Sequence, residues 1–188
     1  KLVYEHLLKV HPDFLVYFLL IYHTALRPKE LVSIQIYNYN EEEQCFKIAQ
    51  DETVILQGET HNKTKTNKTR YVPIPPEAME LLKKMKLNEY PSNYFIFSEG
   101  FKPGANNIER KRATEIWHKE IITHLGIPKK MYGAKHLGVD DKLKQGISIK
   151  AVQNQAGHTR EVMTERYSKE LKKIYQKEIN EKSEGFLG

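Results

Sequence analysis

The stretch GHTREVMTERY, residues 157–167, places a tyrosine nine residues after a histidine. Two cations precede it in the chain, Arg27 in TALRPKEL and Lys65 in KTNKTRYVP. A tyrosine hydroxyl can attack a phosphodiester, and cations can stabilise the charge that grows on the non-bridging oxygens. The ordered series Arg27, Lys65, His158 and Tyr167 therefore predicts that Tyr167 is a nucleophile aimed at a phosphodiester.

The bulk composition fits a water-soluble, basic domain. The 188 residues are enough for one domain with a proper core. The net charge of +6 and the pI near 9.2 permit nucleic acid as a partner without identifying it. A single cysteine, Cys45, excludes an intramolecular disulfide. The longest apolar run, 14–22, is shorter than the roughly 20 residues of a membrane span, and it predicts a buried helix instead.

The apolar patterning predicts an α+β fold, mostly helical, with a small antiparallel sheet of about three strands. We expect Asp13 to cap the helix that contains residues 14–22, and Ser148 to cap a short helix that Gly157 ends. The lysine-rich stretch 61–69 reads as a hairpin tip. The expected strands are 45–48, 54–56 and 70–75. Further helices are expected to begin at Pro28, at Pro76 and at about residue 160, and to cover residues 108–125 and 136–145.

Four boxes resemble the tyrosine recombinase family, also called phage integrases, and specifically its C-terminal catalytic domain. They are TALRPKEL at 24–31, Lys65 eight residues before Pro73, the run 146–158, and TERY at 164–167. The resemblance extends from about Phe14 to Tyr175. It implies a DNA breaking-rejoining domain.

The resemblance also implies a role for each matching residue. Arg27 would clamp the phosphate, and Glu30 would orient the site. Lys65 would act as general acid to the leaving oxygen. His158 would stand beside the phosphate, and Tyr167 would attack it.

One box departs from the family pattern His-x-x-Arg-His. The aligned residues are Tyr132, Lys135 and His136, and His-x-x-Arg occurs nowhere in the chain. Tyrosine and lysine can still donate hydrogen bonds to a phosphate, but a lysine is a point charge and lacks the two-pronged fork of arginine. This variant resembles integrases of mobile elements in Bacteroides-type bacteria. We expect Tyr132 and Lys135 to act on the phosphate and His136 to support them.

Several residues allow a second interpretation. Arg27 could simply pair with Glu30 at a helix end. Lys63 shares the polar loop with Lys65 and is the alternative general acid. His158 could bond to backbone carbonyls at a helix terminus. Tyr175 is the competing nucleophile, although it lacks the preceding threonine box. We further expect cations of the hairpin to contact DNA, namely Lys63, Lys68 and Arg70.

The sequence thus predicts a site-specific recombinase or integrase that forms a 3′-phosphotyrosyl link, with no metal and no cofactor. We expect residues 1–188 to be one catalytic domain of a longer bacterial cytoplasmic protein, without the core-binding and arm-binding domains. The expected partner is double-stranded DNA, on which the full-length protein would form a homotetramer; the isolated domain would be a monomer outside any membrane. Two alternatives are a type IB topoisomerase-like enzyme and a non-catalytic DNA-binding protein.

Overall fold

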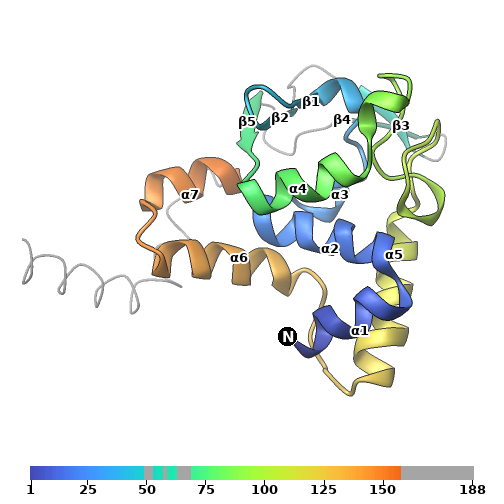
Figure 1. Cartoon of the computed structure of the whole chain (residues 1–188), viewed down its shortest axis with the longest axis vertical. Coiled ribbons are helices and arrows are strands. Elements are labelled where there is room, and N and C mark those ends of the chain that lie inside the picture. The colour runs from blue at the N-terminus through green and yellow to red at the C-terminus, as the bar shows by residue number, and fades with distance from the viewer. Residues whose placement is uncertain (49–52, 57–58, 63–68, 158–188) are drawn as a thin grey trace, which may run out of the picture.

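The computed structural model describes residues 1–48, 53–56, 59–62 and 69–157, and helices dominate this part of the chain (Figure 1). The α+β fold expected from the sequence is confirmed. Its helices are α1 Leu2–Val10, α2 Pro12–Thr24, α3 Pro28–Leu31, α4 Pro76–Lys84, α5 Arg110–Trp117, α6 Gly133–Lys144 and α7 Ile149–Ala156, with short 3-10 turns η1 Ile36–Asn38, η2 Leu87–Glu89 and η3 Glu99–Phe101 and a π-helical segment η4 His118–His124.

Helix α2 is the centre of the core, and α4 and α6 lie on either side of it (Figure 1). Phe14, Leu15, Tyr17, Leu20 and Ile21 of this helix are all buried. Burying such side chains contributes about 1.5–3 kcal/mol each. The apolar run at 14–22 is therefore a buried helix, as its composition predicts.

The start of α2 differs from the expected one. The helix begins at Pro12, so His11 is its N-cap and Asp13 lies inside the first turn. Proline suits the first helical position because its missing N–H would have no intrahelical partner there. A carboxylate in the first turn still interacts favourably with the helix dipole. The prediction of Asp13 as the cap is wrong by two residues.

A three-stranded antiparallel sheet is present, with one strand different from those expected. Its order is β1 (Tyr39–Asn40), β2 (Cys45–Ile48) and β5 (Arg70–Pro73). The expected third strand, now β3 (Thr53–Leu56), pairs with β4 (Glu59–Asn62) in a separate hairpin. Only two residues separate these segments, so local pairing closes a very short loop. Residues 61–62 consequently belong to a strand and not to a hairpin tip.

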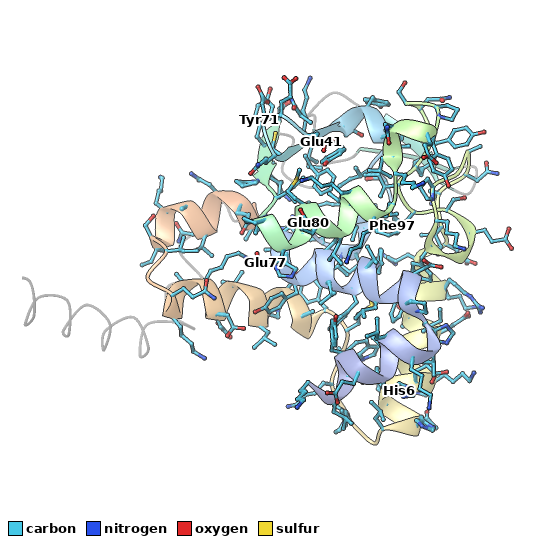
Figure 2. The ribbon with its side chains drawn as sticks, in the orientation of Figure 1. His6, Glu41, Tyr71, Glu77, Glu80 and Phe97 are labelled. Atoms are coloured by element: carbon cyan, nitrogen blue, oxygen red, sulfur yellow. The ribbon has the colours of Figure 1, made fainter. Side chains whose placement is uncertain are left out.

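Strand β5 presents its residues alternately to the two faces of the sheet. Val72 is buried, whereas the side chain of Tyr71 is exposed and labelled on the outer side of the sheet in Figure 2. Because side chains alternate along a strand, Arg70 lies on the same face as Val72. This alternation turns Arg70 toward the helices.

Helix α6 crosses α2 at Gly138, which permits an unusually close approach. A Cβ atom added at Gly138 would overlap the backbone carbonyl of Tyr22. Lys142, one turn further along α6, extends its Nζ to 3.5 Å from the same carbonyl oxygen. Lys135 lies one turn before Gly138, and Arg27 follows α2 in the chain. The crossing therefore brings Lys135 near Arg27.

The last two described helices end close to where the sequence predicts. Helix α6 begins at Gly133, three residues earlier than expected. The hydroxyl of Ser148 accepts a hydrogen bond from the Ala151 N–H, and Gly157 ends α7 with a φ of 63°. Both expected caps of α7 are confirmed. Within the described residues, no helix has the length and apolar character needed to cross a membrane.

Candidate functional site

Arg27 and Glu30 form a closed pair at the start of α3. The backbone N–H of Arg27 donates to Glu30 Oε2 at 2.8 Å, and its Nη1 donates to Oε1 at 2.7 Å. Glu30 is only 4% exposed. A buried carboxylate must be paired or hydrogen-bonded to remain charged. The α3 turn thus fixes the direction of the Arg27 guanidinium.

Arg70 brings a second guanidinium to the same carboxylate from β5. Its Nη2 donates to Glu30 Oε2 at 2.9 Å. Burial lowers the pKa of Arg70, and the positive charge of Arg27 lowers it further, while Glu30 opposes both. An arginine nevertheless keeps its proton in proteins. Glu30 therefore links two permanent cations that are 43 residues apart in the chain (70 − 27).

Lys135 lies beside this pair and is fully buried. Its Nζ donates to the carbonyl oxygen of Ala156, at the end of α7, at 3.0 Å. Burial lowers the pKa of Lys135 to about 7, helped by the charges of Arg27 and Arg70 and opposed by Glu30. The lysine is thus bonded to the protein, and at neutral pH it is close to the midpoint of its titration.

The cluster carries more positive than negative charge. Arg27 and Arg70 are both cationic, and Glu30 balances only one of them. Protonation of Lys135 adds a further positive charge. In surroundings of low polarity such a surplus interacts strongly with an approaching anion. The cluster is therefore suited to bind a phosphate group.

The end of α7 touches the cluster at a glycine. A Cβ atom added at Gly157 would overlap the guanidinium of Arg70. Gly157 also has a positive φ of 63°, which glycine adopts at little cost. His158 is the next residue in the sequence. The structure thus brings the chain to the cluster at the point where this predicted site residue follows.

Tyr132 and His136 lie at the start of α6. The side chain of Tyr132 is exposed, and its ring meets the His136 ring edge-on with centroids 5.0 Å apart. Phosphate contact by Tyr132 stays a prediction.

Five predicted site residues lie outside the described residues: Lys63, Lys65, Lys68, His158 and Tyr167. Their roles stay predictions. The described residues include no group of three or more His, Cys, Asp or Glu side chains arranged to hold a metal ion.

The environment of Arg70 differs from the one expected for a hairpin cation that contacts DNA, because the structure pairs Arg70 with Glu30. The strand alternation with Val72 is the sequence signal for an inward side chain at position 70. No sequence signal predicts that Lys135 is sealed from solvent and bonded to Ala156.

Comparisons with known proteins bear on the family and the fold of this chain. The sequence pattern of the phage integrase family matches residues 8–173. No curated protein sequence matches the chain. Three similar solved structures are the Tn1549 transposon integrase in complex with circular intermediate DNA (15% identity, 87% of this chain, 58% of that chain, TM-score 0.64), XerA recombinase (16%, 97%, 62%, 0.66) and the integrase from mycobacterium phage Brujita (18%, 84%, 47%, 0.58).

These structural likenesses concern the fold, because the identities are low. The chain spans less than two thirds of the length of these solved chains. The family match, in contrast, covers most of the chain, from residue 8 to residue 173. The resemblance seen in the sequence is thereby confirmed, and the chain belongs to the phage integrase family.

Proposed function

We propose that this chain is the catalytic domain, residues 1–188, of a site-specific DNA recombinase that acts through Tyr167. The buried cluster is the observation that carries the proposal. Arg27 and Arg70 share one carboxylate, Glu30, and Lys135 adds a third basic group beside them. Such a surplus of fixed positive charge fits a phosphodiester.

In the proposed reaction, Arg27 and His158 hold the non-bridging oxygens of the scissile phosphate. The hydroxyl of Tyr167 gives its proton to water, its oxygen attacks phosphorus, and the bond to the 5′ oxygen breaks. Lys65 gives a proton to that leaving oxygen. The products are a 3′-phosphotyrosyl link and a free 5′-hydroxyl. Attack by the 5′-hydroxyl of another strand then exchanges the partners.

Lys135 takes part only when it is protonated. Its amine now donates to Ala156 O, and its pKa of about 7 leaves the charged form easily lost. A phosphate placed next to the amine favours the charged form and raises this pKa. We therefore propose that DNA binding and protonation of Lys135 reinforce each other.

The proposed partner is double-stranded DNA inside a bacterial cell. Tyr132 would add a hydrogen bond to the phosphate, with His136 in support. Lys63 and Lys68 would contact the DNA backbone. Because backbone contacts carry little sequence information, the domain alone would discriminate weakly between sites. The full-length protein would assemble as a tetramer on DNA, whereas the isolated domain would be a monomer.

Covalent trapping tests this proposal. The chain is incubated with a randomised pool of duplexes that carry a nick beside each possible cleavage position, so that the freed fragment diffuses away. We expect a denaturation-resistant protein–DNA adduct with the wild type and with Tyr175→Phe, and none with Tyr167→Phe. Sequencing the trapped DNA would give the target site.

Three outcomes would change the proposal. If the wild type binds the pool but traps nothing, the chain is a DNA-binding relative without activity. An adduct that survives Tyr167→Phe and disappears with Tyr175→Phe moves the nucleophile to Tyr175. Relaxation of a supercoiled plasmid without strand exchange between two sites would indicate the topoisomerase-like alternative.

A further inference from the structure

We propose that Arg70 is a positioning residue of this site: it holds Glu30 and the end of α7 in place and does not itself contact DNA. This inference rests on the proposed function, because the groups that it positions are those of the proposed cleavage site. It differs from the expectation that Arg70 is one more DNA-binding cation of the hairpin.

The direction and burial of the Arg70 side chain support this role. Arg70 points to the same face of the sheet as the buried Val72, and its side chain is 13% exposed. Its Nη2 is already engaged with Glu30 Oε2 at 2.9 Å. Its Nε is sealed from solvent and, among the described residues, has no hydrogen-bond partner. A phosphate cannot reach these atoms without displacing protein.

Arg70 also packs against Gly157, at the end of α7. The guanidinium of Arg70 occupies the space that a Cβ atom at position 157 would need. A second link between the same two elements is the Gln155 side chain, whose Nε2 donates to the Pro73 carbonyl at 2.9 Å. Helix α7 therefore docks on β5 through both ends of the strand, Arg70 at one and Pro73 at the other.

Arg70 is connected to the three segments that carry the proposed site residues. Arg70 lies five residues after Lys65 in the chain, its partner Glu30 holds Arg27, and its neighbour Gly157 precedes His158. One side chain thus joins three segments that each contribute to the proposed site. A misplacement of about 1 Å at such a site can lower the rate about a hundredfold.

The test compares Arg70→Gln with Arg27→Gln on a single nicked duplex taken from the trapped pool. Arg27 would contact phosphate, so Arg27→Gln reduces the slope of log binding constant against log salt by about one. Arg70→Gln leaves that slope unchanged but lowers the cleavage rate about a hundredfold. Arg112→Gln, an exposed arginine on α5 outside the site, changes neither.

The conservative variant separates positioning from charge. Arg70→Lys keeps the positive charge but loses the planar fork that reaches Glu30 and packs on Gly157. We expect Arg70→Lys to cleave as slowly as Arg70→Gln. If Arg70→Gln reduces the salt slope by about one and Arg70→Lys restores both slope and rate, Arg70 contacts phosphate and the inference is wrong.

A double-mutant cycle tests the packing without relying on activity. Gly157→Ala lowers the folding constant through backbone strain, about tenfold, and through the clash with Arg70. In an Arg70→Ala background, Gly157→Ala causes only the backbone strain. The factor by which Gly157→Ala lowers the folding constant is therefore at least tenfold smaller there than in the wild type. Equal losses in urea unfolding would refute the contact.

Failure of the proposed function and failure of the positioning role of Arg70 give different results. If the wild type traps no adduct, the proposed function is wrong, and the cycle still decides whether Arg70 holds Gly157. If the wild type traps DNA but the cycle shows no coupling, the proposed function stands and the positioning role of Arg70 is wrong.

Discussion

Two buried glutamates, Glu30 and Glu120, each gather basic side chains in this molecule. Glu30 is 4% exposed and Glu120 is 8% exposed. Glu30 holds two arginines, at 2.7 and 2.9 Å. Glu120 holds His6 at 2.9 Å, His11 at 3.5 Å and Lys119 at 3.2 Å. Both clusters tie together elements distant in the chain, yet they differ in the type of cation.

The cation type decides what each cluster can do. An arginine cannot release its proton, so the Glu30 cluster keeps its surplus positive charge at every relevant pH. Glu120 instead pairs with two histidines and with Lys119, whose side chain is 79% exposed. Water screens an exposed cation, so the Glu120 cluster joins α1 to η4 with less desolvated charge. Figure 2 shows His6 of that joint at the end of the molecule opposite Tyr71 of β5.

The largest expected difference follows from neutralising each glutamate. We expect Glu30→Gln to lower the free energy of unfolding by about 3 kcal/mol, because two partly buried arginines lose their counter-charge. Glu120→Gln should cost about 1 kcal/mol, because the amide oxygen can still accept a hydrogen bond and the partner Lys119 is exposed to water. Urea unfolding of the wild type and both variants at pH 7 measures the two losses in the free energy of unfolding. Equal losses would show that the permanence of the arginine charge is unimportant.

An acid titration sharpens this comparison. The hydrogen bond from His6 lowers the pKa of Glu120 to about 2, although burial alone would raise it. A carboxyl with a lowered pKa stabilises the fold above its unfolded value, 4.5, and this contribution is lost as the pH falls toward 2. The stability gap between wild type and Glu120→Gln should therefore narrow between pH 4.5 and 2. A constant gap would contradict the paired state of Glu120.

The next effect concerns Lys135, the buried third basic group of the Glu30 cluster. We expect Lys135→Met to stabilise the domain by about 2 kcal/mol at pH 6, because methionine fills the space without a buried charge. Below pH 7 the wild type carries this charge in both folded and unfolded states. Between about 7 and 10.5 only the unfolded state holds the proton, so wild-type stability rises with pH.

The stability that Lys135→Met adds should accordingly decrease as the pH rises from about 7 to 10.5. Thermal unfolding of the wild type and the variant across this pH range measures the trend. The cost of the variant is functional: it should weaken DNA binding below pH 7, where the wild-type lysine is charged. A destabilised variant at pH 6 would mean that the bond from Lys135 to Ala156 outweighs the buried charge.

The fold was predictable where patterns are local. The apolar run in α2, the Pro76 start of α4 and the Ser148 cap all depend on neighbouring residues, and the structure has them. The pairing of β3 was not predictable, because an apolar run does not determine which strand pairs with it. The sheet takes residues 39–40 as its third strand for the same reason.

The site shows the same division. The Arg27–Glu30 pair is three residues apart and follows from local capping of α3, in which Glu30 at the third helical position accepts from the backbone N–H of the N-cap residue Arg27. The bond from Arg70 to Glu30 spans 40 residues and depends on how β5 docks against α3. The bond from Lys135 to Ala156 depends on the packing of α6 against α7. Such contacts require the tertiary fold, so the order of residues along the chain did not predict the partners of Arg70 and Lys135.

The smallest expected effect comes from Lys119, the third basic group of the other cluster. Lys119 is the counterpart of Lys135, but its side chain is 79% exposed. An exposed ion pair contributes about 0–1 kcal/mol, because water and salt screen it. Lys119→Met should therefore change the free energy of unfolding by less than about 0.5 kcal/mol, as measured by urea unfolding at pH 6. A shift as large as that of Lys135→Met would mean that the carboxylate, and not burial, sets the energetic weight of a neighbouring lysine.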